Sequence, residues 1–429
     1  MPDSLRNNIH IISNNMEMKR LVRLPMYLAM GAFVAAFTVA CDDDDNKMEE
    51  GLSEQEKVLK SVIEDYIDNS VVPTYKGLAD AAIELSDLCE RMRDTGAGNV
   101  TPEMVEDAGS AWVKARRYWE LSEAWLFGAA ADYNIDPHID TWPLDKAAMD
   151  NMLNNAAQMA QMADAGKAAA YVGNNLGQGL LGFHAVEYML FELTDNGNDK
   201  QAHSTDYTQN ELNYLAAVAG DLRNQCVRLE VSWADEGTYA ESSGKWGYLA
   251  GAELEPTFYY GESMKNSGLG GSKYKSYAEA VQELLVGAQD IADEVGGQKI
   301  GNPIGHGETD DPDYIESPYS LNSIEDFTDN LKSIRTAYMG YQPETGVTEN
   351  YIRPVTHSLS DYIRSVDKTL DERVRTAIED AISKIRKMKE PFAKTARAAE
   401  YRQINLDAQE ACQAVNDILD EVMNAVQDN

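Results

Sequence analysis

The segment 179–191 holds the residues best suited to do chemistry, because it is almost entirely apolar and yet contains one imidazole and one carboxylate. His184 and Glu187 are three residues apart, so on a helix they share one face. An unpaired buried carboxylate costs several kcal/mol, so Glu187 requires a cation, a metal or a hydrogen-bond donor. The segment has no Lys or Arg. This pair is therefore the leading candidate for a functional site.

A second group of polar side chains lies in a helix expected at 101–127. There Trp112, Arg116, Trp119 and Glu123 fall on one stripe. Arg116 and Glu123 are two helical turns apart on this aromatic face. They form either an internal ion pair or part of a site, and the sequence leaves both readings open.

Several familiar motifs of catalytic and binding sites are missing. An inverted zinc motif requires His at position 188, which is Tyr188. The chain has no P-loop, dinucleotide fingerprint, EF-hand loop or Gly-x-Ser-x-Gly elbow. Its net charge of −35 disfavours nucleic acid as a partner. Without a Cys-x-x-Cys pattern, Cys89, Cys226 and Cys412 are expected to be buried free thiols.

The first forty residues are typical of an export signal. A basic stretch at 19–23 precedes a short apolar run that ends at Cys41. This pattern resembles a bacterial lipoprotein signal, with Cys41 as the acylated first residue of the mature protein. A plain secretory signal and a short membrane anchor are the alternatives. We expect a signal peptide at 1–40, an acidic tether at 41–52, and a lipoprotein of the cell envelope that is anchored in the outer membrane and exposed on the cell surface.

Helical periodicity runs through nearly every long segment after residue 53. Helices are expected at 54–90 with an interruption at Pro73, and at 101–127, 179–191, 210–233, 277–295, 324–338, 359–389 and 401–426. No strand-like alternating run of any length appears, and a turn-rich stretch at 236–274 suits a domain boundary. We predict an all-α protein of two four-helix-type bundles packed side by side, formed by residues 53–245 and 246–429.

Several sequence motifs of this chain resemble those of a known protein family. Gly182-Phe-His184-Ala-Val-Glu187 is similar to the Gly-x-His-x-x-Glu motif of the imelysin-like proteins. Further blocks resemble the family in the same order along the chain: Ala115-Arg116-x-Tyr118, Asp140-x-Trp142-Pro143-Leu144-Asp145, the helix at 214–233, and Glu316-Ser317-Pro-Tyr319-Ser320-x-Asn322-Ser323. The resemblance covers about residues 53–429. It implies two helical bundles with the His/Glu motif near their interface.

The resemblance also implies a role. Members are secreted or anchored proteins of bacterial envelopes, some are linked to iron acquisition, and the founding member was described as a metallopeptidase. It further implies that Arg116, Ser317 and Ser320 help to bind the ligand. This chain departs from some relatives at Glu316 and Leu321, where they have His and Asp.

Three functions remain open. The first is a metal-binding envelope lipoprotein for iron uptake or handling, with zinc as the alternative metal and an unidentified uptake partner. Its ligands would be His184, Glu187 and Glu123, with Arg116 orienting Glu123, because carboxylate oxygens and one imidazole suit iron. The second is a metallopeptidase in which Glu187 is ligand or general base. The third is a surface module for a glycan, haem or peptide, with His184 and Glu187 as a structural pair.

Of these we expect the first, with binding but without rapid hydrolysis. His184 and Glu187 should then line a cavity between the two bundles, and Glu123 should reach it.

Overall fold

The computed structural model describes residues 51–234, 244–343, 352–354 and 357–427. The predicted signal peptide, Cys41 and most of the acidic tether lie outside the described residues. Residues 52–429 form one compact unit.

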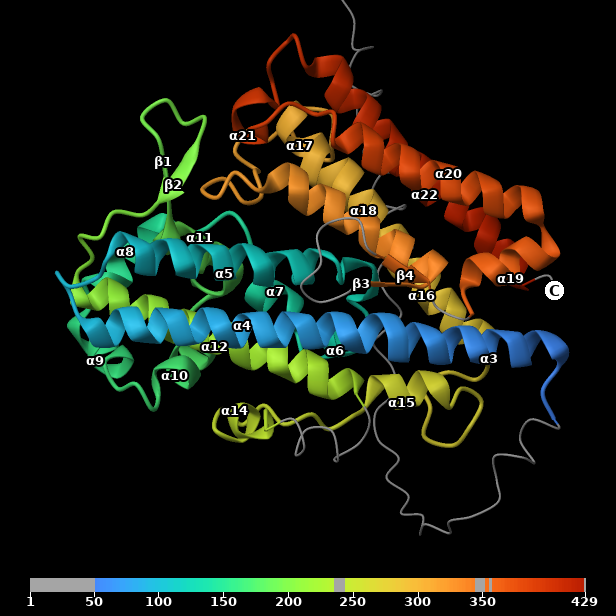
Figure 1. Ribbon diagram of the computed structural model, residues 1–429, viewed down its shortest axis with the longest axis horizontal. Coiled ribbons are helices and arrows are strands. Elements are labelled where there is room, and N and C mark those ends of the chain that lie inside the picture. Colours follow the sequence, from blue (N-terminus) through green and yellow to red (C-terminus); the bar gives the residue numbers. More distant parts are fainter. Residues whose placement is uncertain (1–50, 235–243, 344–351, 355–356, 428–429) are drawn as a thin grey trace, which may run out of the picture. The chain divides into compact units, whose positions relative to one another are not determined.

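Helices make up most of this unit, and Figure 1 shows their order. In the first half they are α3 (Glu54–Tyr66), the π-helix η1 (Ile67–Val71), α4 (Val72–Thr95), α5 (Pro102–Glu120), the 3₁₀-helix η2 (Glu123–Trp125), α6 (Ala129–Asp132), α7 (Asp136–Ile139), α8 (Lys146–Leu153), α9 (Ala156–Met162), α10 (Ala168–Asn175), the 3₁₀-helix η3 (Gln178–Leu180), α11 (Gly182–Leu190) and α12 (Gln209–Trp233).

In the second half they are α14 (Trp246–Ala250), α15 (Tyr260–Lys265), α16 (Tyr277–Glu294), the π-helix η4 (Val295–Ile300), α17 (Gly301–Ile304), α18 (Ser323–Met339), α19 (Leu359–Val366), α20 (Lys368–Ile385), α21 (Phe392–Thr395) and α22 (Arg402–Gln427). Two short antiparallel hairpins complete the described elements: β1 (Phe191–Leu193) pairs with β2 (Lys200–Ala202), and β3 (Tyr341–Pro343) pairs with β4 (Ile352–Pro354). The predicted all-α class is confirmed.

Local sequence signals set the ends of α5. The Thr101 side chain accepts a hydrogen bond from the N–H of Met104, and a proline occupies the first turn. The helix ends at Glu120, earlier than expected, because the Trp119 carbonyl accepts hydrogen bonds from both the N–H and the hydroxyl of Ser122 (2.8 and 2.7 Å). Glu123 therefore lies in the separate turn η2 and not on the stripe of α5.

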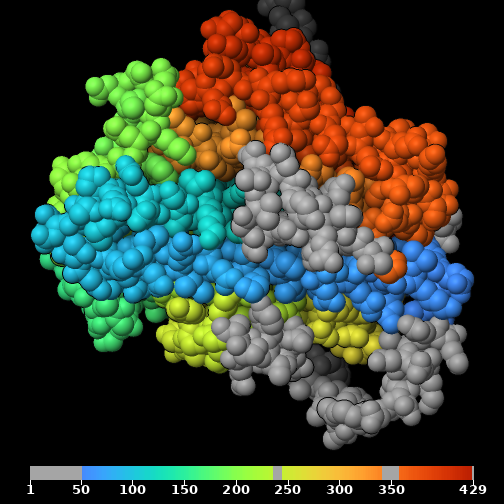
Figure 2. All heavy atoms as spheres, in the orientation of Figure 1, coloured from blue at the N-terminus to red at the C-terminus, as the bar shows by residue number. Residues whose placement is uncertain are grey.

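Packing joins the two halves of the chain. Helix α4 packs against α5 and α12, while α22 packs against α16 and α20. Helix α18 contacts α5, and α16 contacts η2, so helices of both halves meet around one continuous apolar core. On the viewed face of Figure 2, atoms of the first half (blue) lie directly against atoms of the second half (orange). The division into two bundles stays a prediction.

Two further predictions concern the cysteines and a possible membrane-spanning helix, and both are considered for the described residues. Cys89, Cys226 and Cys412 are buried free thiols, as expected. No described helix is both long enough and apolar enough to cross a membrane.

Candidate functional site

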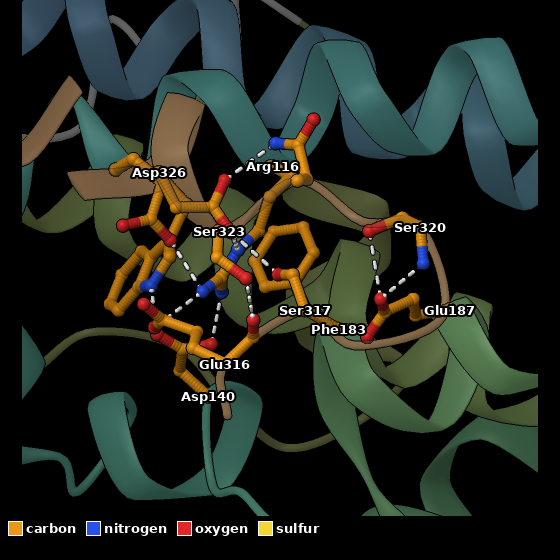
Figure 3. Close-up of polar contacts among 12 residues, drawn as sticks. Arg116, Asp140, Phe183, Glu187, Glu316, Ser317, Ser320, Ser323 and Asp326 are labelled. Atoms are coloured by element: carbon orange, nitrogen blue, oxygen red, sulfur yellow. Dashed lines mark hydrogen bonds and ion pairs between the residues drawn. The ribbon is translucent and has the colours of Figure 1, made fainter. Parts of the chain in front are cut away.

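Nine titratable side chains meet in the interior of the unit, and none of these residues is more than 4% exposed. We call them the polar core: Arg116, Glu120, Glu123, Asp140, His184, Glu187, Lys299, Glu316 and Asp326. Figure 3 shows part of it, with Arg116 lying among Asp140, Glu316 and Asp326. Both halves of the chain contribute residues to the polar core.

Gly182 explains how His184 reaches Asp140. It opens α11 with φ of 70°, a conformation that glycine adopts readily. A Cβ atom at this position would overlap the carbonyl group of Ile139. Because Asp140 follows Ile139 directly, this close approach places Asp140 Oδ1 3.2 Å from His184 Nε2. The glycine of the Gly-x-His-x-x-Glu motif is thus required by geometry.

Glu187 finds its partners in a distant loop. His184 Nδ1 lies 3.1 Å from Glu187 Oε2. The other oxygen, Oε1, accepts hydrogen bonds from the N–H groups of Tyr319 and Ser320 (3.0 and 2.7 Å) and from the Ser320 hydroxyl (2.7 Å). Ser320 and Glu187 face each other in Figure 3. Glu187 is therefore fully engaged, and it can orient the His184 ring.

The loop that holds Glu187 is itself conformationally constrained. Ser317 and Leu321 have φ of 50° and 56°, which is unfavourable for residues other than glycine. The Ser317 hydroxyl donates to Asp326 Oδ2 at 2.5 Å. The two predicted ligand-binding serines thus hold carboxylates of the polar core, and both are fully buried.

Arg116 is the hub of one side of the polar core. Its Nη2 lies 2.6 Å from Glu120 Oε1 and 2.8 Å from Glu316 Oε1. It also contacts Asp140 and Asp326. No ion pair joins Arg116 to Glu123 among the described residues, so Arg116 does not orient Glu123 as the sequence had suggested.

Glu123 pairs instead with Lys299, a residue that sequence reasoning missed. Lys299 lies in the π-helix η4, a rare and wide helical turn often found at functional sites. Its Nζ is 3.0 Å from Glu316 Oε1 and 3.4 Å from Glu123 Oε2. A signal was present, because Lys299 is the only Lys or Arg between Lys275 and Lys332.

Charge is unbalanced in the polar core. Three basic side chains, Arg116, Lys299 and His184, face six carboxyl groups. Burial raises the pKa of Glu120 and Glu123 well above the usual range, and it raises the pKa of Asp326 to about 7. This is the direction expected if buried acids take up protons to reduce excess negative charge.

The pKa values of Asp140 and His184 are shifted in opposite directions. Although burial opposes it, Arg116 and His184 hold the pKa of Asp140 well below its usual range. Burial alone would lower the pKa of His184, but the carboxylates of Asp140 and Glu187 raise it to about 9. An imidazolium held between two carboxylates is the result at neutral pH.

Two overlapping groups of side chains could hold a metal ion. In the first, ligand atoms of Asp140, His184 and Glu316 lie within 4.8 Å of one another. In the second, those of Glu120, Glu123 and Asp140 do so. We call the first group the central triad. Among the described residues, Glu316 Oε2 has no hydrogen-bond partner, and His184 Nε2 contacts only the Asp140 carboxylate of the same triad, so the triad offers a carboxylate oxygen and an imidazole nitrogen as ligands for a cation.

A pocket of about 260 Å³ leads to His184 and Glu187. Its walls come from both halves of the chain: Trp142, Pro143, Leu144, Pro312, Asp313, Ile315, Pro318, Tyr319 and Ala393. The ring of Trp142 lies 6.0 Å from that of His184. His184 and Glu187 therefore line a cavity, as predicted. Glu123 lies elsewhere in the polar core and is not among the residues that line this pocket.

Comparison with known proteins gives a consistent picture. The model of the family Imelysin (Peptidase_M75) matches residues 71–422. Iron-regulated protein A of Synechococcus elongatus is 27% identical over 290 residues, which cover 68% of this chain and 67% of that protein. A crystal structure from Parabacteroides distasonis, described as an iron-regulated protein A precursor, has a TM-score of 0.68 and 24% identity and covers 87% of this chain and 96% of that chain. That of an imelysin-like protein from Psychrobacter arcticum has a TM-score of 0.54 and 13% identity, with 86% and 93% covered.

Proposed function

The chain belongs to the imelysin family, and from this premise we propose that it binds a metal ion, iron in the first place, at the central triad of Asp140, His184 and Glu316. The iron-related role is supported by kinship, because the Synechococcus relative is named an iron-regulated protein. The observation that carries the site is the buried oxygen Glu316 Oε2, which has no hydrogen-bond partner among the described residues and lies in a core with excess carboxyl groups.

The donor set suits iron. One imidazole nitrogen and carboxylate oxygens are ligands that iron and manganese accept, whereas a structural zinc site is rich in Cys and His. Glu187 supports the triad from behind: its contact with Nδ1 fixes the His184 ring and leaves Nε2 for the ion. We therefore place Glu187 in a supporting position, whereas Glu123, the other glutamate that the sequence suggested as a ligand, pairs with Lys299 and lies outside the triad.

The charge of the polar core favours a cation as the ligand. Three basic groups offset only part of six carboxyl groups, and the remainder must be balanced by protons or by a bound cation. Metal ligands bind in their deprotonated form, so an entering ion would displace protons from the triad and its neighbours. His184 would lose its Nε2 proton while Glu187 keeps the contact with Nδ1.

The pocket limits what can enter. Pockets for drug-sized ligands measure about 300–1,000 Å³. The pocket at His184 measures about 260 Å³, below that range. This favours a hydrated ion or a small complex over haem.

Hydrolysis has less support than binding. In the metallopeptidase alternative, Glu187 would be the general base that accepts a proton from an attacking water, which requires a free carboxylate. Glu187 is held by His184 and by three donor groups of Tyr319 and Ser320, so it is poorly placed to act as a base. The family's peptidase name keeps this alternative in the test.

The function is tested by calorimetric titration of the purified chain with ferrous, ferric and zinc ions. We expect one ion to bind, and His184→Ala to weaken binding by more than the roughly 10–100-fold typical of losing a supporting residue. His203→Ala is the matched control, because His203 also pairs with a glutamate, Glu192, but lies outside the polar core. Absence of binding by all three ions would refute the proposal. Metal-dependent peptide cleavage that is lost in Glu187→Gln would favour the peptidase.

We propose in addition that the protein works at the cell envelope as a lipoprotein of the outer membrane, held through Cys41. This rests on the sequence at 19–45. An anchored protein outside the cytoplasm is well placed to take up or hand on a metal ion.

A further inference from the structure

The ammonium group of Lys299 has the surroundings of a hard metal cation. Its Nζ lies 3.0 Å from Glu316 Oε1, 3.2 Å from Asn330 Oδ1 and 3.4 Å from Glu123 Oε2. Glu120 Oε2 follows at 3.7 Å. The Lys299 side chain is fully buried. Carboxylate and amide oxygens are the ligands that hard divalent cations prefer.

Two of these side chains, Glu120 and Glu123, belong to a group of potential metal ligands that adjoins the central triad. Glu120, Glu123 and Asp140 form the second group of potential metal ligands, and Asp140 is shared with the triad. Lys299 contacts members of both groups, namely Glu120 and Glu123 on one side and Glu316 on the other. Two-metal centres in helical bundles likewise use carboxylates from several helices around ions about 3.5–4 Å apart.

We propose that the place between Glu120 and Glu123 is a second cation position and that Lys299 fills it with its own ammonium group. The centre then takes one metal ion where the arrangement of carboxylates would otherwise hold two. Lys299 is thus the residue that sets the metal stoichiometry. For the first ion this inference rests on the proposed function, whereas the second position rests on the contacts of Lys299.

An observation beyond the acidic cluster supports a ligand-binding role. Glu316 is fully buried, and its Oε2 has no hydrogen-bond partner among the described residues, although its Oε1 contacts both Lys299 and Arg116. A carboxylate that serves only as a counter-ion would be expected to satisfy both oxygens. A carboxylate shared by two cations requires this arrangement, in which Oε1 contacts the Lys299 ammonium group and Oε2 is left for the metal ion.

The experiment compares Lys299→Met and Lys299→Gln with the wild-type full chain, using Mn²⁺ alone as the probe. Bound ions per chain are measured by elemental analysis after equilibrium dialysis. Lys332→Met is the matched control, because Lys332 is also a buried lysine in a carboxylate pair, with Asp329 at 2.5 Å, but it lies outside the polar core. Circular dichroism checks that each variant is folded.

We expect both Lys299 variants to bind one ion more per chain than the wild type, and Lys332→Met to bind as the wild type does. Adding Glu123→Gln to a Lys299 variant should return the stoichiometry to the wild-type value. Unchanged stoichiometry in folded Lys299 variants would overturn the inference and leave the proposed function standing. A wild type that binds no Mn²⁺, with one ion gained by the Lys299 variants, would keep the second position, and the proposed function would then be decided by the titration with ferrous, ferric and zinc ions.

A separate arm decides the matter if neither Lys299 variant folds. Glu123→Gln in the wild-type background should keep the first ion with less than a tenfold change in affinity, since Glu123 faces Lys299 and is not in the central triad. Loss of that ion in Glu123→Gln would mean that the two groups form a single site, which would overturn the inference.

Discussion

Gly182→Ala tests whether a single close approach of two backbone segments builds the site. Alanine at φ of 70° carries the strain of the left-handed region, about 1–2 kcal/mol. Its Cβ would also overlap the Ile139 carbonyl, and overpacking of this kind costs about 1–3 kcal/mol. We therefore expect a loss of roughly 2–5 kcal/mol in the free energy of unfolding.

The size of the folded unit decides the assay. Unfolding entropy of about 2.1 cal/mol/K per residue means that a unit of this size shifts its melting temperature by only about 1 °C per kcal/mol. Urea unfolding is therefore the better measurement, with the midpoint read at an unchanged slope. Iron binding is titrated on the same variant, because displacing Ile139 also moves Asp140 away from His184.

Gly98→Ala is the matched control for the strain. Gly98 has φ of 80°, and an added Cβ there would meet no atom within 4 Å. It should show the strain of about 1–2 kcal/mol alone and bind metal as the wild type does. If Gly182→Ala loses no more stability than Gly98→Ala and keeps its metal affinity, the contact with Ile139 does not position the site.

Two further perturbations test the hub of the polar core and the anchor. Arg116→Met removes a guanidinium that contacts four buried carboxylates, and we expect a loss of about 3–5 kcal/mol in urea unfolding or insoluble protein. Arg373→Met, which breaks an exposed pair with Glu421, should leave the midpoint nearly unchanged, and equal midpoints for the two variants would show that Arg116 does not hold the core together. Cys41→Ala should move the protein from the membrane fraction to the soluble fraction of the producing bacterium, and membrane retention with an uncleaved leader would mean that the apolar run is a membrane anchor.

Local sequence patterns were sufficient for the helices and for the His184 pair. The periodicity at 210–233 and 277–295 matches α12 and α16 within a residue, because a long amphipathic helix carries its own signal. His184 and Glu187 could be predicted to be buried because their segment is apolar on both sides. The same reasoning correctly required a partner for Glu187.

Contacts between side chains that are far apart in the sequence could not be predicted from local patterns. The partners of Glu187 come from Tyr319 and Ser320, more than 130 positions away, and no local pattern links the two segments. The predicted relation of Arg116 to Glu123 failed because it assumed that α5 continues past Glu120. Asp140 follows a short helix, and its role depends on the approach of α11 rather than on its own neighbours.

The polar core is better explained by function than by stability. Replacing a buried ion pair by well-packed apolar residues is often neutral or stabilising by about 1–4 kcal/mol. A cluster of nine buried titratable groups is therefore expected to lower the stability of the fold relative to an apolar core. Apolar residues surround this region: Trp112 and Trp119 are buried on the same helix as Arg116, and the Phe183 ring lies against its guanidinium group. A bound cation would also return stability to the folded state, about 4 kcal/mol at a concentration a thousandfold above the dissociation constant. A metal site requires excess carboxylates, a histidine oriented by a neighbour such as Glu187, and a pocket that leads to it. A purely structural core requires none of these features.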